Sequence, residues 1–218
     1  MKKQKNGNHL FNVFTYLLKN ISTKIKAGSL KKLSDYIFII LEKITLKFPS
    51  FLYEYILYYE DIVESEIRLA DITSGDKVLH IGCGSLPSTA ILLSQKIGIQ
   101  TTALEKNPSS VKDAKFTVKT LHQEYQVKIN QANALNYPIE SYSVIVVSQG
   151  IEPRYEVLNH IAKTMQTGTR VLFRTFSSNT GGITSQDTIL NTIFNVGKTV
   201  LHPQHGLLMT ILLKTKTK

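Results

Sequence analysis

A glycine-rich turn is the feature of this sequence with the clearest chemical use. The apolar run Val78-Leu79-His80-Ile81 leads directly into Gly82-Cys83-Gly84, and residues 88–97 then show helical spacing of apolar side chains. Glycines at such a turn let the backbone bend sharply and approach a ligand closely, because no Cβ atom stands in the way. A pyrophosphate-binding turn carries a third glycine three positions later, but Pro87 stands there in this chain. The turn therefore predicts a cradle for a different small molecule.

Two further polar residues follow the next two predicted strands. Glu105 ends the run from Thr101, and Asn133 comes soon after the run that ends at Gln131. An acid at the first place accepts hydrogen bonds from ribose hydroxyls, and the amide of Asn133 can contact adenine. Because ligands bind at the carboxyl ends of parallel strands, these residues and the turn converge on one crevice.

A G-x-G turn followed by such an acid and such an amide is typical of enzymes that bind S-adenosylmethionine, so we expect that cofactor. Cys83 is interpreted as a small filler rather than a nucleophile, because no histidine partner to activate it is evident. The predicted cofactor-binding residues are Gly82, Cys83, Gly84, Ser85, Pro87, Glu105, Lys106, Asn133, Ala134 and Ser148.

Strands and helices alternate through most of the chain, which implies a parallel sheet. Strands are predicted at residues 77–81, 101–105, 127–131, 144–148 and 169–174, and helices at residues 88–97, 108–124 and 154–165. The end of the chain differs, because the runs Lys198–His202 and Leu207–Leu213 are separated by only four residues. Such a short connection permits only an antiparallel hairpin.

Five alternating units closed by a hairpin resemble the sheet of class I S-adenosylmethionine-dependent methyltransferases. The resemblance implies an α/β, Rossmann-like fold with a seven-stranded, mostly parallel sheet and a C-terminal antiparallel hairpin. We assign residues 71–218 to this cofactor-binding domain and residues 1–70 to a basic helical N-terminal extension or lid. Helical spacing predicts helices in that extension near residues 10–21, 29–44 and 51–70.

Within that superfamily the chain resembles nicotianamine synthases and the related staphylopine-type synthases. The stretch Ile81-Gly82-Cys83-Gly84-Ser85-Leu86-Pro87-Ser88-Thr89 is similar to their turn, a hydrophobic residue followed by G-S-G-x-x-P-x-[ST], with Cys83 in place of the usual serine. A helix from Arg154 leading to a strand that ends at Arg174, and the acidic, tyrosine-containing residues 58–73, are also similar. The resemblance implies transfer of the cofactor's aminocarboxypropyl arm to an amine.

The resemblance also implies catalytic roles for three residues. Glu66, or Glu64 beside it, would be the general base that takes a proton from the attacking amine. Tyr59 would orient the cofactor or the amine, and Arg174 would hold a carboxylate through a bidentate pair. The alternatives are an exposed helix face for Glu64 and Glu66, and simple packing for Tyr59.

Other functions stay open at this stage. Methyl transfer to a small-molecule acceptor is favoured because the class is larger, and it requires little more than an in-line arrangement of the reacting atoms. Residues 148–153 lack the Asn-Pro-Pro-Tyr motif of enzymes that methylate nucleic-acid amines. The third alternative is a Rossmann binding module without catalysis, and the intact turn with Glu105 argues against it.

The basic character of the chain is concentrated at its start. Residues 1–50 hold ten lysines and two acids, which account for most of the net charge of +10. A solvated lysine face on helices that cap the site explains this pattern. A weak contact of this segment with an anionic surface is the alternative. Arginines are scarce in the segment, so there is no firm evidence for binding to nucleic acid.

Cysteine and apolar content bear on the compartment. Cys83 is the single cysteine, so no intrachain disulfide forms, which fits a reducing compartment. We expect no secretory signal and no transmembrane segment, because no stretch approaches about 20 apolar residues. His202 and His205 lack zinc-site spacing, so we expect no metal. We expect a cytoplasmic protein.

Overall fold

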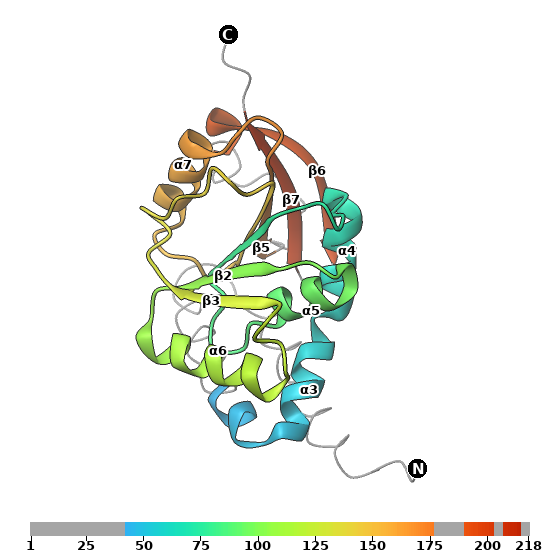
Figure 1. Cartoon of the computed structure of the whole chain (residues 1–218). Coiled ribbons are helices and arrows are strands. Elements are labelled where there is room, and N and C mark those ends of the chain that lie inside the picture. The colour runs from blue at the N-terminus through green and yellow to red at the C-terminus, as the bar shows by residue number, and fades with distance from the viewer. Residues whose placement is uncertain (1–41, 177–189, 203–206, 215–218) are drawn as a thin grey trace.

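The computed structural model describes residues 42–176, 190–202 and 207–214. Seven strands form one sheet in the order β3-β2-β1-β4-β5-β7-β6 (Figure 1). Strands β1 to β5 pair in parallel with one another, whereas β7 is antiparallel to both β5 and β6. This confirms the predicted α/β fold with its closing hairpin. The strands are β1 (Val78–Ile81), β2 (Thr101–Glu105), β3 (Val127–Gln131), β4 (Val144–Val147), β5 (Arg170–Phe176), β6 (Phe194–His202) and β7 (Leu207–Lys214).

The central strands β1 and β4 are buried along their whole length, because helices cover both faces of the sheet there. Alternate residues belong to two separate cores: Val78 and Leu172 pack on one side, and Leu79 and Val171 on the other. Helices α3 (Pro49–Tyr58), α4 (Glu60–Ala70), α5 (Ser88–Ile97) and α6 (Pro108–Thr120) contribute to the first core, and α7 (Arg154–Thr164) contributes to the second. Because successive side chains of a strand point to opposite faces of the sheet, every second residue faces the helical layer that includes α4.

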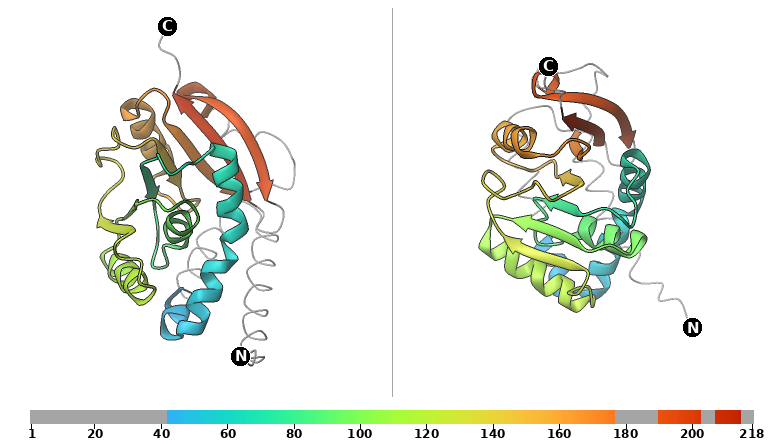
Figure 2. Two further views of the ribbon diagram at one scale, coloured as in Figure 1. Left: turned by 45° about the vertical axis from the view of Figure 1, so that its right-hand side comes forward. Right: turned by 45° about the horizontal axis from the view of Figure 1, so that its top comes forward.

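Helices α3 and α4 run end to end along one side of the molecule (Figure 2). The single helix predicted over 51–70 is divided at Tyr59, whose N–H donates to the carbonyl of Ile56 at 3.0 Å. This three-residue hydrogen bond tightens the chain and separates the two helices. Residues 42–47 are also helical. The other helices predicted at 10–21 and 29–44 lie largely outside the described residues, and the domain boundary near residue 70 stays a prediction.

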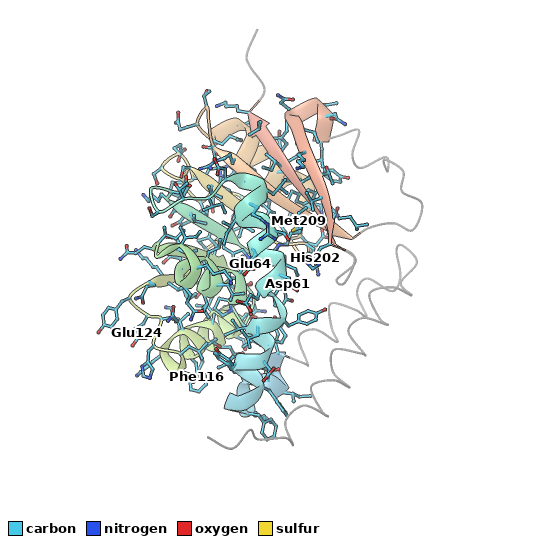
Figure 3. All side chains as sticks on the ribbon, turned by 90° about the vertical axis from the view of Figure 1, so that its right-hand side faces the viewer. Asp61, Glu64, Phe116, Glu124, His202 and Met209 are labelled. Atoms are coloured by element: carbon cyan, nitrogen blue, oxygen red, sulfur yellow. The ribbon has the colours of Figure 1, made fainter. Side chains whose placement is uncertain are left out.

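The C-terminal hairpin packs against α4. Ile62 on α4 and Met209 on β7 are both fully buried and form a small apolar cluster. Figure 3 shows Asp61 and His202 in the same region. Burial lowers the pKa of His202, and the nearby carboxylate of Asp61 offsets part of that effect. The hairpin thus fixes α4 over the sheet. Among the residues that the structure describes, no helix is both long and apolar enough to cross a membrane.

Candidate active site

The glycine turn has the backbone that its sequence requires. Gly82 has φ +79° and Gly84 has φ +65°, in the left-handed region that favours glycine. The N–H groups of Gly82 and Cys83 both donate to the carbonyl of Leu104 at the end of β2, at 2.9 and 3.0 Å. These bonds hold the turn against β2. The turn therefore has a fixed shape at the carboxyl end of β1.

A cavity of about 390 Å³ opens beside this turn, at the carboxyl ends of the parallel strands. It collects predicted residues from the turn, from the ends of β2, β3, β4 and β5, and from the α3–α4 junction. These are Tyr59, Gly82, Cys83, Gly84, Glu105, Lys106, Asn133, Ala134, Ser148 and Arg174. Ser85, Pro87 and Glu66 do not line it.

Glu105 links the glycine turn to the next strand. Its Oε2 accepts a hydrogen bond from the N–H of Gly84 at 3.1 Å, and its Oε1 accepts one from the N–H of Asn107 at 2.8 Å. Both bonds come from backbone groups, so the remaining lone pairs of the carboxylate are available to ribose hydroxyls at the cavity wall. The position fits the role that the sequence predicts for Glu105.

The other predicted cofactor residues occupy different parts of the cavity. Asn133 accepts a hydrogen bond on Oδ1 from the N–H of Leu135 at 3.1 Å, which fixes its amide after β3. Lys106 Nζ donates to the carbonyl of Glu152 at 2.7 Å and connects the β2 and β4 loops. Cys83 is 5 % exposed, and burial raises the pKa of its thiol, as expected of a packing residue.

Ser85 and Pro87 lie behind the turn rather than on the cavity surface. The N–H of Ser85 donates to Glu42 Oε2 at 3.2 Å, and its hydroxyl donates to Asp113 at 3.5 Å. Pro87 is the residue that precedes α5. Both residues therefore shape the turn and its helix, and direct contact with a cofactor is not evident for either.

The predicted catalytic pair forms a buried salt bridge. Arg174 Nε and Nη2 donate to the two carboxylate oxygens of Glu66, each at 2.6 Å, and Nη2 also donates to Thr89 Oγ1 at 2.9 Å. Burial alone would lower the pKa of Arg174, but the carboxylate of Glu66 outweighs it and raises that pKa. Arg174 reaches the cavity, whereas Glu66 has no exposed surface.

This pairing gives Glu66 the environment of a positioning residue. Both of its oxygens are occupied by Arg174, and it has no path to an attacking amine through the cavity surface. The neighbouring Glu64 lies on the outer side of α4 (Figure 3), where it pairs with Lys96 at 2.7 Å. The exposed helix face that was the alternative for both acids thus describes Glu64 but not Glu66.

An acid that the sequence did not single out lies at the cavity instead. Glu42 accepts hydrogen bonds from the N–H of Ser85 and from the hydroxyl of Tyr55, the latter at 3.4 Å. The Tyr55 hydroxyl is also 3.3 Å from that of Tyr59. Burial raises the pKa of Glu42 to about 7. A carboxylate with that pKa is suited to accept a proton near neutral pH.

Glu42 is missed in the sequence because it stands 43 positions before Ser85 and in a basic segment. The nearest signal is its interruption of the apolar run that ends at Leu41. A charge at that place is unexpected on a buried helix face unless it has partners. Among the described residues, no group of three or more His, Cys, Asp or Glu side chains is placed to hold a metal.

The approach of Glu42 to the turn can be tested by adding a single methyl group. A Cβ at position 84 would lie 3.2 Å from Glu42 Oε1, whereas a Cβ at Gly98, with φ +73°, would meet nothing within 4 Å. Gly84→Ala and Gly98→Ala are each expected to lose about 1–2 kcal/mol of unfolding free energy from backbone strain. Calorimetry should show that only Gly84→Ala also weakens binding of S-adenosylhomocysteine, by about tenfold or more. Equal affinities for the two variants would contradict this geometry.

Comparisons with known proteins show which sequences and structures this chain is similar to. No protein-family model matches the chain. The chain is 25 % identical over 123 residues to an L-histidine 2-aminobutanoyltransferase of Yersinia pestis, a match covering 56 % of this chain and 45 % of that protein. It is 29 % identical over 111 residues to a malonyl-[acyl-carrier protein] O-methyltransferase of Paenibacillus sp. (strain JDR-2), covering 48 % of this chain and 40 % of the relative. The matches thus span less than half the length of either relative.

Solved structures extend the comparison to nearly the whole chain. A glutamate-to-glutamine mutant of the nicotianamine synthase MtNAS has a TM-score of 0.73 at 19 % identity, over 96 % of this chain and 79 % of that one. The same mutant with S-adenosylmethionine has a TM-score of 0.65, also at 19 % identity, over 94 % and 75 %. The fold of class I S-adenosylmethionine-dependent methyltransferases, inferred above from the sequence, is therefore confirmed, and so is the resemblance to nicotianamine synthase.

Proposed function

We propose that this chain is an S-adenosylmethionine-dependent transferase that acts on an amine of a small-molecule acceptor. The observation that carries the proposal is the joint presence, in one cavity, of the glycine turn with Glu105 and of Glu42 with its two tyrosines. The first group fits a nucleoside with an amino-acid arm. The second supplies a base of suitable pKa at the same turn.

The cavity residues divide into two sets in this proposal. Glu105 would bind the ribose, Asn133 and Ala134 would contact adenine, and Gly82 and Gly84 would let the backbone approach the amino-acid arm. Lys106 and Ser148 would complete the walls. When bound, the cofactor supplies an electrophilic carbon next to a sulfonium. Arg174, Tyr59 and Glu42 also line this cavity, and Tyr59 and Glu42 would face the acceptor.

The protein's part in the reaction is to orient the amine and to remove its proton. Glu42 would accept that proton, and Tyr55, which donates to Glu42, would hold the carboxylate in place. Burial raises the pKa values of Tyr55 and Tyr59, so both hydroxyls stay protonated near neutral pH and act as hydrogen-bond donors. Glu66, which does not line the cavity, would hold Arg174 in place through their salt bridge.

The aminocarboxypropyl arm is the group that we propose is transferred. Support comes from the likeness to MtNAS over nearly the whole chain and from the match to the aminobutanoyltransferase. Methyl transfer, which the sequence alone favours, is the second candidate and is supported by the match to the O-methyltransferase. A cytoplasmic location and contact of the basic N-terminal segment with an anionic surface stay predictions.

Calorimetric titration with S-adenosylmethionine, S-adenosylhomocysteine and methylthioadenosine tests the cofactor site. We expect micromolar binding, and we expect Glu105→Ala to weaken it by about a hundredfold, because the variant loses charge-assisted hydrogen bonds to the ribose and the support of Gly84. A Glu124→Gln variant should bind as the unmodified chain does, because Glu124 is exposed and is not among the residues that line the cavity. Absence of binding by all three compounds would contradict the proposal.

The released product then separates the two candidate reactions. Incubation with S-adenosylmethionine and a panel of amines should release methylthioadenosine if the aminocarboxypropyl arm is transferred. Release of S-adenosylhomocysteine would establish methyl transfer instead. Chromatography of the nucleoside products distinguishes these results whichever amine of the panel serves as the acceptor.

A further inference from the structure

A polar subsite lies at the carboxyl ends of three adjacent strands, on the side of the sheet covered by α4 and α5. It consists of His80 on β1, Ser148 directly after β4, and Arg174 on β5 with Thr89 of α5 beside it. All four residues line the cavity. The alternation of the strands explains their common side, since Val78, Val146 and Leu172, each two positions earlier, pack in the core of that face.

His80 has an incomplete set of hydrogen bonds. It is 3 % exposed, and its Nε2 lies 2.9 Å from the hydroxyl of Ser148. Its Nδ1 is buried and has no partner among the described residues. A buried polar atom without a partner is costly in a folded protein and is uncommon. Because His80 is one of the residues that line the cavity, a ligand bound there is the partner that we consider for this nitrogen.

The surroundings of His80 indicate the chemistry of that ligand. Burial and the positive charge of Arg174 lower the pKa of His80 to about 3, so the imidazole is neutral at physiological pH. The bonds of Arg174 use Nε and Nη2, and within the described part of the chain Nη1 has no hydrogen bond. A guanidinium donor and an imidazole nitrogen at one wall are suited to a planar anionic group.

We propose that His80 is a ligand-binding residue whose Nδ1–H donates a hydrogen bond to a carboxylate held beside Arg174. This inference rests on the proposed function, because both molecules of that reaction can carry a carboxylate: the amino-acid arm of the cofactor, or an amino-acid acceptor. Binding selects the tautomer in which the Ser148 hydroxyl donates to Nε2 and the proton resides on Nδ1. Ser148 is then a positioning residue for the imidazole.

Two substitutions of His80 distinguish the role of its Nδ1 from the role of its Nε2. In His80→Asn the side-chain amide branches where the imidazole carries Nδ1, so the donor to the carboxylate is kept. In His80→Gln the amide reaches the position of Nε2, so the contact with Ser148 is kept and the donor to the carboxylate is lost. Calorimetry would compare these variants with S-adenosylhomocysteine and with methylthioadenosine, which lacks the amino-acid arm. L-histidine and histamine, titrated in the presence of methylthioadenosine, would serve as acceptor probes with and without a carboxylate.

We expect His80→Gln to lose about tenfold or more in affinity for one carboxylate-bearing compound, with His80→Asn close to the unmodified chain. Loss for S-adenosylhomocysteine but not methylthioadenosine assigns the subsite to the cofactor arm. Loss for L-histidine but not histamine assigns it to the acceptor. Equal affinities of both variants for every compound, or equal losses with and without the carboxylate, overturn the inference while leaving the proposed function intact.

A measurement on the unmodified chain avoids any dependence on how the variants fold. The nitrogen resonances of His80, identified by through-bond assignment, report its tautomer and the hydrogen bonding of Nδ1. We expect the carboxylate-bearing compound to shift the Nδ1 resonance and its carboxylate-free partner to leave it unchanged. If no nucleoside binds at all, the proposed function itself fails, which calorimetry would already have shown.

Discussion

Replacing Arg174 by methionine is expected to lower the free energy of unfolding by about 3–5 kcal/mol. The substitution would leave the carboxylate of Glu66, which has no exposed surface, without the guanidinium that satisfies both of its oxygens. A buried charge without a partner has lost its hydration and gains nothing in return. Chemical denaturation followed by circular dichroism would measure the loss.

The double variant Glu66→Leu with Arg174→Met tests whether the unpaired carboxylate of Glu66 causes the loss of stability. Removing both charges together takes away the desolvation cost along with the attraction, so the double variant should be more stable than Arg174→Met alone. It should nevertheless lack transfer activity, because Arg174 lines the cavity. Loss of activity at regained stability would show that the pair is needed for transfer rather than for folding.

An exposed ion pair on the same helix gives the matched control. Arg68 and Glu64 lie 3.7 Å apart on α4, with 69 % and 40 % of their side chains exposed. Because water already solvates both charges, Arg68→Met is expected to change stability by less than about 1 kcal/mol. If Arg174→Met lost no more than Arg68→Met, the buried carboxylate of Glu66 would not depend on the guanidinium of Arg174.

The parts of the site that the sequence predicts are those encoded by short-range patterns. The turn at Gly82 and Gly84 is visible because positive φ angles select glycine, and the hairpin around residues 203–206 is visible because a short connection leaves one possible pairing. Glu105 is visible because it is the acid that ends the second predicted strand. In each case neighbouring residues carry the whole signal, and the tertiary fold adds nothing to it.

The parts that the sequence does not predict depend on contacts between distant segments. Glu66 and Arg174 are 108 positions apart, and only the packing of α4 over β5 reveals that they neutralise each other. Glu42 reaches Ser85 across 43 positions. His80 reads as one polar residue in an apolar strand, and its contact with Ser148 follows only from the pairing of β1 with β4. The roles of these residues depend on which distant side chain each one is buried against, and residue type alone does not reveal that partner.

Replacing Glu42 by glutamine is expected to reduce kcat/KM for transfer to an amine by about 10²–10⁴-fold. Glutamine keeps the shape of the side chain: its oxygen can still accept from the N–H of Ser85, and its NH2 group can donate to the hydroxyl of Tyr55. The turn and the cofactor affinity should therefore change little. What glutamine cannot do is accept the proton that the attacking amine must lose. Initial rates at saturating cofactor, together with calorimetry on the same variant, would measure the two effects separately.

The pH dependence of the unmodified chain provides an independent test of the same role. Burial raises the pKa of Glu42 to about 7, so the carboxylate is mostly ionised above that pH and mostly protonated below it. A general base must be ionised, and kcat/KM reports the free enzyme, so kcat/KM should fall about tenfold per pH unit as the pH drops below about 7. Glu42→Gln should lack this decline, since the amide does not titrate. A decline that persists in Glu42→Gln would assign the base to another group, whereas its disappearance, with cofactor affinity unchanged, would identify Glu42 as the proton acceptor.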